Sequence, residues 1–286
     1  MKIDIIICSN RSSDTIKACL NRLLNILPEE VSIIVVLPIN HPFLSNINIY
    51  HPRIRFIGAL RENISYQRNL GLSNSTAEII GFLDDDTILQ KDHVKKIIDI
   101  FSTSNSIIGI GGRVVNYQKT PTILHIYRKF FGLSISTKDG TSNQLKSGFF
   151  NFPDVSIYPK EVQALWGCCM WWRRDYIIDC RFNEQLSAFQ DIEFSYQVNY
   201  KGKLILIEDA EFIHLRMKEN RSEINRLFSQ VSAAKKIALS NKSIKFSYLY
   251  WCWSILGLIF LFFIYMISQN SSLFAAEYSE ISILDG

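Results

Sequence analysis

The chain has 286 residues, of which 31 are lysine or arginine and 27 are aspartate or glutamate, for a formal net charge of +4. This length suits one large globular domain or at most two small ones. The sequence shows no concentrated basic cluster, which argues against nucleic-acid binding. The small positive excess is compatible with a nearby anionic membrane surface.

Apolar, β-branched runs alternate with helical patterns in the first part of the chain. We expect buried strands at 5–8, 31–37, 54–57, 79–83 and 107–115, and helices at 16–24, 64–72 and 94–101. Such alternation predicts an α/β fold with a mainly parallel twisted sheet flanked by helices. Ligands of such sheets bind beyond the carboxyl ends of the strands. The polar residues that follow the first and fourth strands fall at such ends.

The second part of the chain is less regular. Residues 130–160 predict a long loop, and ordered structure resumes at 166–174. A loop and a helix are expected over 181–202, a short strand over 204–207 and a helix over 222–238.

Residues 246–267 contain no charged side chain. As a helix they would extend about 33 Å, close to the roughly 30 Å of a bilayer's hydrocarbon core. Aromatic residues lie near both ends, lysines precede the segment, and the tail that follows has no lysine or arginine. The pattern predicts a cytosolic domain over 1–240, a transmembrane helix over 246–267 and a short extracytoplasmic tail over 268–286. The protein would be a single-pass protein of the inner or plasma membrane; a buried core helix or an interfacial hairpin is the alternative.

Three adjacent carboxylates, Asp84, Asp85 and Asp86, end the strand predicted at 79–83. Their mutual repulsion raises at least one pKa unless a cation is present. A divalent metal removes the repulsion, and hard oxygen ligands suit Mg²⁺ or Mn²⁺ held together with substrate phosphates. The triplet therefore predicts a metal site for a nucleotide diphosphate. An acidic turn that caps the following helix is the alternative.

Two later motifs carry further candidate groups. Asp191 and Glu193 open an amphipathic segment, where backbone N–H groups can hold a carboxylate and a general base could face an acceptor hydroxyl. Simple helix capping is the alternative for that motif. His214 follows the strand predicted at 204–207, and a lone histidine is more often structural than a ligand.

In their order along the chain, these motifs resemble those of family 2 glycosyltransferases of the GT-A fold. The resemblance covers residues 3–216. The first strand with Ser9, Asn10 and Arg11 is similar to the family's polar turn that faces the nucleotide, and residues 82–86 look like its DxD motif. The other matching segments are 65–71, similar to an Ala-Arg-Asn-x-Gly helix; 166–170 with Arg173 and Arg174, similar to the acceptor-side strand; 182–184 and 190–194, similar to the Glu-Asp block; and His214, at the place of a metal-binding histidine.

The resemblance implies an inverting, non-processive and metal-dependent transfer of a sugar from a nucleotide-sugar donor. The implied acceptor is membrane-associated, either a lipid-linked polysaccharide or a glycolipid of the cell envelope. Asp191 would be the catalytic base, and Asp86 and His214 would bind Mg²⁺ or Mn²⁺. The residues expected to contact the nucleotide-sugar are Ser9, Asn10, Arg11, Arg68, Asp84 and Asp85. No Gln-x-x-Arg-Trp motif follows Asp191, which argues against a processive synthase.

Two positions depart from the family's pattern. No aspartate follows the strand at 31–37, where Asn40 could replace it, and Gln190 stands where the family has a glutamate before Asp191. These departures support an alternative, a catalytically impaired subunit that binds nucleotide or glycan and scaffolds a polysaccharide-assembly complex. A third hypothesis, a nucleotidyltransferase, lacks the glycine-rich phosphate loop that it would need after the first strand.

Overall fold

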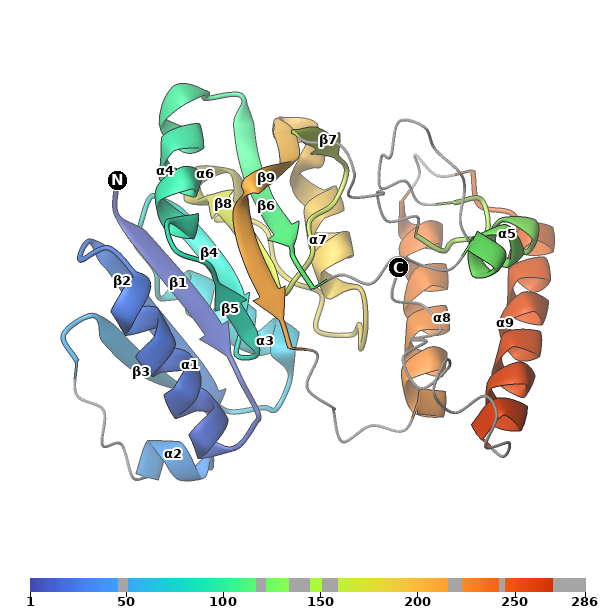
Figure 1. Ribbon diagram of the computed structural model, residues 1–286, viewed down its shortest axis with the longest axis horizontal. Helices are drawn as coiled ribbons and strands as arrows, with labels where there is room; N and C mark the ends of the chain where they lie inside the picture. The colour runs from blue at the N-terminus through green and yellow to red at the C-terminus, as the bar shows by residue number, and fades with distance from the viewer. Residues whose placement is uncertain are drawn as a thin grey trace. The chain divides into compact units, whose positions relative to one another are not determined.

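The computed structural model describes residues 1–45, 51–116, 122–133, 145–150, 159–215, 223–241 and 245–269 of the chain. The chain divides into two compact units (Figure 1). Unit 1 comprises Met1–Tyr117, Val155–Leu186 and Gln190–Glu219, and unit 2 comprises Gln118–Asp154, Ser187–Phe189 and Asn220–Gly286.

Unit 1 is built on a nine-stranded sheet with the strand order β3-β2-β1-β4-β8-β6-β9-β5, and β7 also pairs with β9. Its strands are β1 (Ile3–Cys8), β2 (Val31–Pro38), β3 (Ile54–Ala59), β4 (Ile79–Asp84), β5 (Thr87–Leu89), β6 (Ile107–Val114), β7 (Lys160–Val162), β8 (Cys169–Arg173) and β9 (Lys203–His214). Its helices are α1 (Ser13–Ile26), α2 (Pro42–Ser45), α3 (Ile64–Ser73), α4 (His93–Thr103), α6 (Arg174–Ile177) and α7 (Gln190–Val198).

The sheet is mixed, which corrects the prediction of a mainly parallel one. Strands β3, β2, β1 and β4 are parallel neighbours, as their helical crossovers require. Strand β8, in contrast, runs antiparallel to both β4 and β6, and β5 and β7 run antiparallel to β9. The physical reason is connectivity. β8 follows a long excursion of the chain and β5 follows a tight turn, so neither is bound to the parallel arrangement that a helical crossover imposes.

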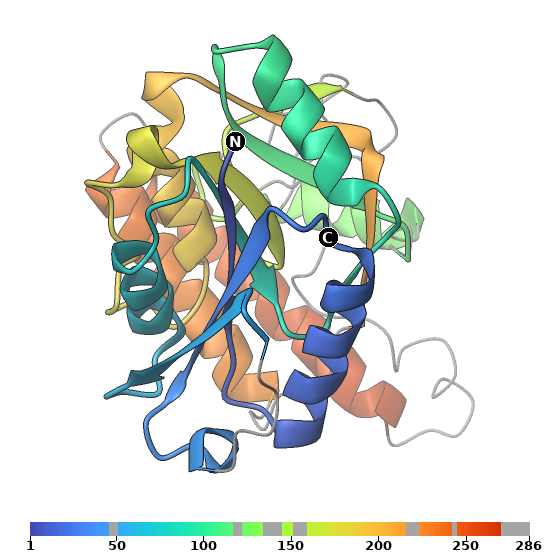
Figure 2. The same cartoon turned by 90° about the vertical axis from the view of Figure 1, so that its left-hand side faces the viewer.

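Both faces of the sheet are covered by helices (Figure 2). Ile3, Ile5 and Ile7 of β1 share one core with buried residues of α1 and α4. Ile6 and Cys8 belong to the opposite core, together with residues of α3, α6 and α7. A strand buried on both faces needs a continuous apolar run, which is the pattern that predicted these strands.

His93, at the start of α4, is 1% exposed and hydrogen-bonded through both ring nitrogens. Nδ1 lies 2.9 Å from the Glu211 carbonyl oxygen, and Nε2 lies 3.1 Å from Trp171 Nε1. Because a carbonyl only accepts and an indole N–H only donates, the ring must be neutral with its proton on Nδ1. Burial lowers the pKa of His93 to about 4.

This neutral histidine should make the fold sensitive to acid. An unfolded histidine has a pKa of about 6.5, so below that pH the unfolded chain binds a proton that the folded chain does not bind. The stabilisation is fully present above the unfolded pKa and is lost as the pH falls towards the folded value, in total about 3 kcal/mol. Urea denaturation from neutral pH down to pH 4 should show this loss in the wild type and a smaller one in His93→Gln. Equal losses in both proteins would contradict the assignment.

Unit 2 contains three described helices, α5 (Thr122–Phe130), α8 (Glu223–Ser240) and α9 (Tyr248–Gln269). The sequence predicted α8 and a helix at α9 but not α5. Two side chains of α9 cap the end of α5: Trp253 Nε1 donates to the Phe130 carbonyl at 2.9 Å, and Ser254 Oγ donates to the Phe131 carbonyl at 2.6 Å. These bonds satisfy carbonyl groups that the end of a helix leaves without partners.

Helix α9 coincides with the segment 246–267, which was predicted to span a membrane. Among the residues that the structure describes, no helix combines the length and apolar character needed to cross a bilayer, so the spanning prediction is not supported. Helix α8 lies within the predicted domain 1–240 but groups with unit 2. Much of the loop predicted at 130–160, and the tail from residue 270 onward, lie outside the described residues.

Candidate active site

The aspartate triplet lies beyond the carboxyl end of β4, directly beside the turn that follows β1. The strand register pairs Cys8 with Asp84, so the residues after each strand are neighbours. Ser9 Oγ donates a hydrogen bond to Asp85, and Arg11 Nε lies 3.1 Å from the same carboxylate. The structure thus brings Ser9 and Arg11 onto the triplet, at the edge where parallel strands place their ligands.

Asp86 lies between two basic side chains. Its Oδ2 atom is 3.0 Å from Arg11 Nη2, and its Oδ1 atom is 3.2 Å from His214 Nε2. His214 reaches this place because β9 is longer than the short strand predicted, and Thr87, at the start of β5, is its register partner. The turn at the triplet therefore folds the chain directly onto the end of β9.

Asp84, Asp86 and His214 form a group that could hold a metal ion. Each offers one ligand atom, and these atoms all lie within 4.8 Å of one another. Two carboxylates favour Mg²⁺ or Mn²⁺, and an imidazole ligand is better suited to a transition metal. The chemistry of this donor set therefore suits a divalent cation. The sequence predicted Asp86 and His214 as ligands, whereas Asp84 was predicted as a contact of the nucleotide-sugar.

A second chain of contacts joins the triplet to Asp191. Arg68 Nη2 lies 3.0 Å from Asp84 Oδ1 and donates to the Gly167 carbonyl at 3.1 Å. The Gly167 N–H donates to Asp191 Oδ2 at 2.5 Å. A Cβ atom on Gly167 would lie 3.0 Å from Asp191 Oδ2 and 3.1 Å from Arg68 Nη2, so a larger residue there would require these two side chains to shift by a few tenths of an ångström. Gly167 therefore sets the position of Asp191 relative to Arg68.

Burial shapes the electrostatics of the triplet. It raises the pKa of Asp84, although the neighbouring Arg68 guanidinium acts in the opposite direction. It also raises the pKa of Asp85 to about 6, against the hydrogen bond from Ser9 and the charge of Arg11. Adding positive charge here would favour the ionised carboxylates, so the site is suited to a cation.

Two residues of α3 support the site; the sequence analysis placed them in the motif at 65–71 but gave them no role of their own. Gln67 Nε2 donates to Asn10 Oδ1 at 3.0 Å and to the Val36 carbonyl at 3.3 Å, which joins the turn after β1 to strand β2. Asn69 fixes the loop before α7, donating to the Phe182 carbonyl at 2.9 Å and accepting from the Phe182 N–H at 2.8 Å. The available signal was a run of polar residues at buried positions of a helix packed on the sheet.

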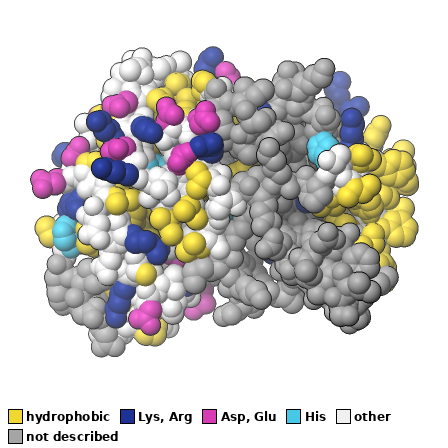
Figure 3. All heavy atoms as spheres, viewed as in Figure 1, with side chains coloured by type: hydrophobic (Ala, Val, Ile, Leu, Met, Phe, Trp, Pro, Cys, Tyr) yellow, Lys and Arg dark blue, Asp and Glu magenta, His cyan; other side chains and the backbone are white. Residues whose placement is uncertain are grey.

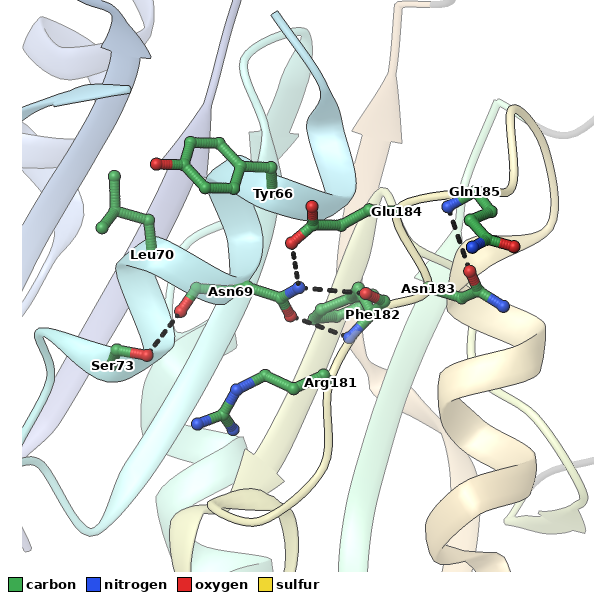
Figure 4. A pocket seen from close by; sticks show the side chains of 9 residues that line it. All are labelled: Tyr66, Asn69, Leu70, Ser73, Arg181, Phe182, Asn183, Glu184 and Gln185. Carbon is green, nitrogen blue, oxygen red and sulfur yellow. Dashed lines mark hydrogen bonds between the residues drawn. The ribbon is translucent and has the colours of Figure 1, made fainter. Parts of the chain in front are cut away.

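Figure 4 shows this connection inside a cavity of about 520 Å³ between α3 and the loop before α7. Asn69 points from the helix to Phe182 and Glu184 on the loop. Neither the triplet nor His214 or Asp191 lines this cavity. The cavity matters for the site because Asn69 ties α3 to this loop, and the loop leads into α7, the helix that carries Asp191.

Asn69→Ala should therefore destabilise unit 1. The substitution removes two hydrogen bonds to the Phe182 backbone and one to Glu184, and it leaves buried backbone groups without partners. At roughly 1 kcal/mol for each bond, we expect a loss of about 2–3 kcal/mol in the free energy of unfolding. Urea denaturation measures the loss, and Ser73→Ala on the exposed side of the same helix should change stability by less than about 0.5 kcal/mol. Similar values for the two variants would rule out this role for Asn69.

A second, polar cavity of about 320 Å³ adjoins the turns that follow β1 and β2. Asn10, Arg11, Asn40, His41 and Glu62 are among the residues that line it. Asn40, which follows β2 where the resemblance expects an aspartate, thus lies in a cavity next to the predicted nucleotide contacts.

Three other residues of the predicted motifs lie outside this cluster. Arg173 donates to the carbonyls of Ile107 and Ser104, and Arg174 donates to the Ser75 carbonyl. Glu193 binds Gln197 within α7. The bonds of these side chains go to backbone carbonyls or to Gln197 and not to the group around Asp84, Asp86, Asp191 and His214.

Comparison with known proteins agrees with this architecture. The chain is 23% identical over 176 residues to the succinoglycan biosynthesis protein ExoM of Rhizobium meliloti (strain 1021), which covers 60% of this chain and 50% of that protein. The chain therefore spans about half the length of this curated relative.

Several solved structures share the fold at low sequence identity. The mannosyltransferase PcManGT from Pyrobaculum calidifontis, in complex with GDP-Man and Mn²⁺, matches with a TM-score of 0.58 at 12% identity, covering 90% of this chain and 74% of that chain. TarS of S. aureus in complex with UDP-GlcNAc matches with a TM-score of 0.53 at 15% identity, covering 86% and 68%. GalNAc-T7 with UDP, GalNAc and Mn²⁺ matches with a TM-score of 0.57 at 13% identity, covering 74% and 43%.

The family itself is decided by sequence. The model of glycosyl transferase family 2 matches residues 4–180, which is more than half of the chain and includes the turn after β1, the aspartate triplet and β8. The chain belongs to glycosyl transferase family 2.

Proposed function

We propose that this chain is an inverting, non-processive glycosyltransferase that uses a nucleotide-sugar donor and a divalent metal, Mg²⁺ or Mn²⁺. The observation that carries the proposal is the convergence of Asp84, Asp86 and His214 within 4.8 Å, next to an Asp191 that is tied to Asp84 through Gly167 and Arg68. A metal-binding group beside a candidate base is suited to sugar transfer from a nucleotide diphosphate.

The donor end of the reaction would be the departing nucleotide diphosphate. A divalent ion held by Asp84, Asp86 and His214 would supply positive charge to the diphosphate as the glycosidic bond breaks. The nucleoside would occupy the polar cavity lined by Asn10 and Asn40, where amide groups can hydrogen-bond a base. Fold relatives solved with UDP-GlcNAc, or with GDP-Man and Mn²⁺, support this choice of donor class.

The acceptor end of the reaction would be Asp191. Its Oδ2 atom accepts from the Gly167 N–H, which holds the carboxylate in a fixed orientation at the start of α7. In that orientation it would take the proton from an acceptor hydroxyl as the hydroxyl oxygen attacks the anomeric carbon. A single displacement of this kind inverts the configuration at that carbon.

We place the acceptor among membrane-associated glycans, either a lipid-linked polysaccharide or a glycolipid at the cytoplasmic face of the cell membrane. Support comes from the relative that functions in succinoglycan biosynthesis. Gln190, one of the two departures behind the scaffold alternative, has a structural bond of its own, because its amide donates to the Leu186 carbonyl at 3.1 Å.

The test is a donor screen on the full chain. Free nucleotide diphosphate is measured for a panel of nucleotide sugars with Mn²⁺, with Mg²⁺ and with EDTA, in the presence of membrane glycolipid extract. Release from one donor that stops in EDTA is the expected result. The absence both of release and of metal-dependent nucleotide binding would overturn the proposal and favour the scaffold.

Arg11 should compete with the metal ion in the absence of nucleotide. Its guanidinium pairs with Asp85 and with Asp86, one of the proposed ligands, so a cation bound by Asp86 would meet a like charge. Removing a like charge at this range should strengthen binding by about 1–2 kcal/mol, or roughly tenfold. Arg11→Gln should therefore bind Mn²⁺ about tenfold more tightly in a titration without nucleotide.

Lys17→Gln serves as the matched control for this prediction, because it makes the same change of net charge in α1. It should leave the Mn²⁺ affinity unchanged. Equal affinities for Arg11→Gln and the wild type would show that the guanidinium does not compete with the ion.

A further inference from the structure

We infer that unit 2 docks onto an anionic phospholipid membrane through one apolar face formed by α5 and α9. The inference is argued from exposed side chains and charge in unit 2. It rests on the proposed function in one respect, because it names the surface that would hold the enzyme on the membrane that carries the acceptor. We define the apolar face by its exposed residues Ile123, Ile126 and Phe130 of α5, and Leu249, Trp253, Leu256, Phe260 and Phe263 of α9.

Helix α5 exposes its apolar side. Ile123 is 73% exposed and Phe130 is 65% exposed, with Ile126 on the same side of the helix, because residues three and seven apart share a face. A helix of a soluble protein normally turns such a stripe towards the core. Tyr127, which is only partly exposed, joins α5 to α9 through the bond from its Oη to the Gly257 carbonyl at 2.6 Å.

Helix α9 extends the same surface. Its exposed residues on the apolar face recur at spacings of three and four, whereas Ser254, Leu258 and Leu261 form a buried stripe. The rings of Phe130 and Trp253 are in contact, with centroids 5.4 Å apart, so the exposed sides of the two helices are continuous. Figure 3 shows hydrophobic side chains gathered over α5 and α9, with Lys and Arg side chains beside them.

Charge favours a lipid surface as the occupant of this face. Within the described part of unit 2 the only acidic residue is Glu223, whereas the basic residues are Arg128, Lys129, Lys146, Arg226, Lys235, Lys236 and Lys245. The whole chain has a net charge of only +4, so positive charge is concentrated in this unit. Each basic residue near an anionic bilayer adds electrostatic attraction, which a neutral protein partner would not supply.

The aromatic residues at the start of α9 fit the boundary between water and lipid. Lys235 Nζ lies 5.3 Å from the ring of Tyr248 and 4.7 Å from that of Trp251, and Lys146 Nζ lies 5.9 Å from the ring of Tyr250. Tyrosine and tryptophan beside lysine are typical of the headgroup region, where the rings contact lipid and the ammonium groups contact phosphate. An apolar face bordered by such residues has the composition of a membrane-binding surface.

The test is co-sedimentation of the full chain with vesicles of phosphatidylcholine, with or without phosphatidylglycerol. We expect binding at least about tenfold tighter to the phosphatidylglycerol vesicles, and weaker binding as salt is added. The double variant Ile123→Glu/Ile126→Glu should bind at least about tenfold more weakly, because it removes apolar burial and adds like charge to the lipid.

The matched control is Leu60→Glu/Tyr200→Glu, which makes the same kind of change at two residues of unit 1 that are 74% and 78% exposed. It should bind vesicles as the wild type does. The inference would be overturned if binding did not depend on lipid charge, or if the α5 variant bound vesicles as tightly as the wild type. A third result would also overturn it: the chain does not bind vesicles but self-associates in light scattering, and the α5 variant abolishes that self-association.

The donor screen separates this inference from the proposed function. Nucleotide release by a chain that does not bind vesicles would leave the transferase standing and remove the docking surface. Vesicle binding by a chain that neither releases nor binds nucleotide would do the reverse.

Discussion

Asp191→Asn is expected to lower kcat by about 10² to 10⁴, the usual contribution of a positioned general base. Asparagine has nearly the same shape, and its Oδ1 atom can still accept the hydrogen bond from the Gly167 N–H. The fold and the connection to Arg68 should therefore survive, while the group that takes the acceptor proton is lost. Initial rates at saturating donor, with binding of the nucleotide diphosphate measured in parallel, provide the test.

Glu193→Gln is the matched control, because it removes a carboxylate two residues further along α7. Glu193 is partly buried and binds Gln197, which is one turn away. We expect its kcat to stay within a few-fold of the wild type, since none of its contacts among the described residues joins it to the group around the triplet. A similar loss in both variants would mean that the stability of α7, and not proton transfer, limits the rate.

Most of unit 1 could be predicted because its elements are fixed by local patterns. The apolar runs at 5–8 and 31–37 and the helical spacing at 64–72 became β1, β2 and α3 with small changes at their ends. Parallel pairing of these first strands followed from the alternation of strand and helix. The orientation of β8 did not, because nothing in the residues 169–173 records which neighbours that strand will have.

The candidate site was predictable as a set of residues but not as a set of contacts. Turns at the ends of neighbouring strands had to meet at one edge, so Ser9, Arg11 and the triplet were expected together. Gly167 was part of a recognised motif, yet its contact with both Arg68 and Asp191 depends on a backbone approach that only coordinates reveal. The pairing of Asp85 with Ser9 and Arg11 likewise depends on which way its side chain turns.

The C-terminal part shows the limit of composition as evidence. The uncharged segment 246–267 predicted a spanning helix, and a helix is what the chain forms there. Its packing could not be predicted, because α5, which the sequence did not reveal, occupies one side of it. Tertiary contacts of this kind decide which apolar side chains are buried, and composition alone does not record them.

Asp86→Asn should weaken metal-dependent nucleotide binding at least about 100-fold. Loss of a group that hydrogen-bonds a metal ligand typically costs about 10- to 100-fold in affinity, and a directly coordinating carboxylate contributes more. Asp86 also contacts two basic side chains, with Oδ2 3.0 Å from Arg11 Nη2 and Oδ1 3.2 Å from His214 Nε2. Asparagine keeps the shape and a carbonyl oxygen but removes the charge that offsets both the metal and these neighbours.

The measurement is a titration of UDP and GDP into each protein with Mn²⁺ and again with EDTA. The wild type should bind one nucleotide in Mn²⁺ and lose that binding in EDTA, whereas Asp86→Asn should bind equally weakly in both. Asp92→Asn is the matched control, because Asp92 is exposed and has a φ of 65°, a conformation that asparagine also adopts. Asp92→Asn changes the net charge by the same amount as Asp86→Asn. If it keeps full metal-dependent nucleotide binding, the loss in Asp86→Asn is due to the site and not to the change of charge. If Asp86→Asn kept the same EDTA-sensitive affinity as the wild type, the ion would have to be held elsewhere. The proposed role of His214 as a ligand next to Asp86 would then also be wrong.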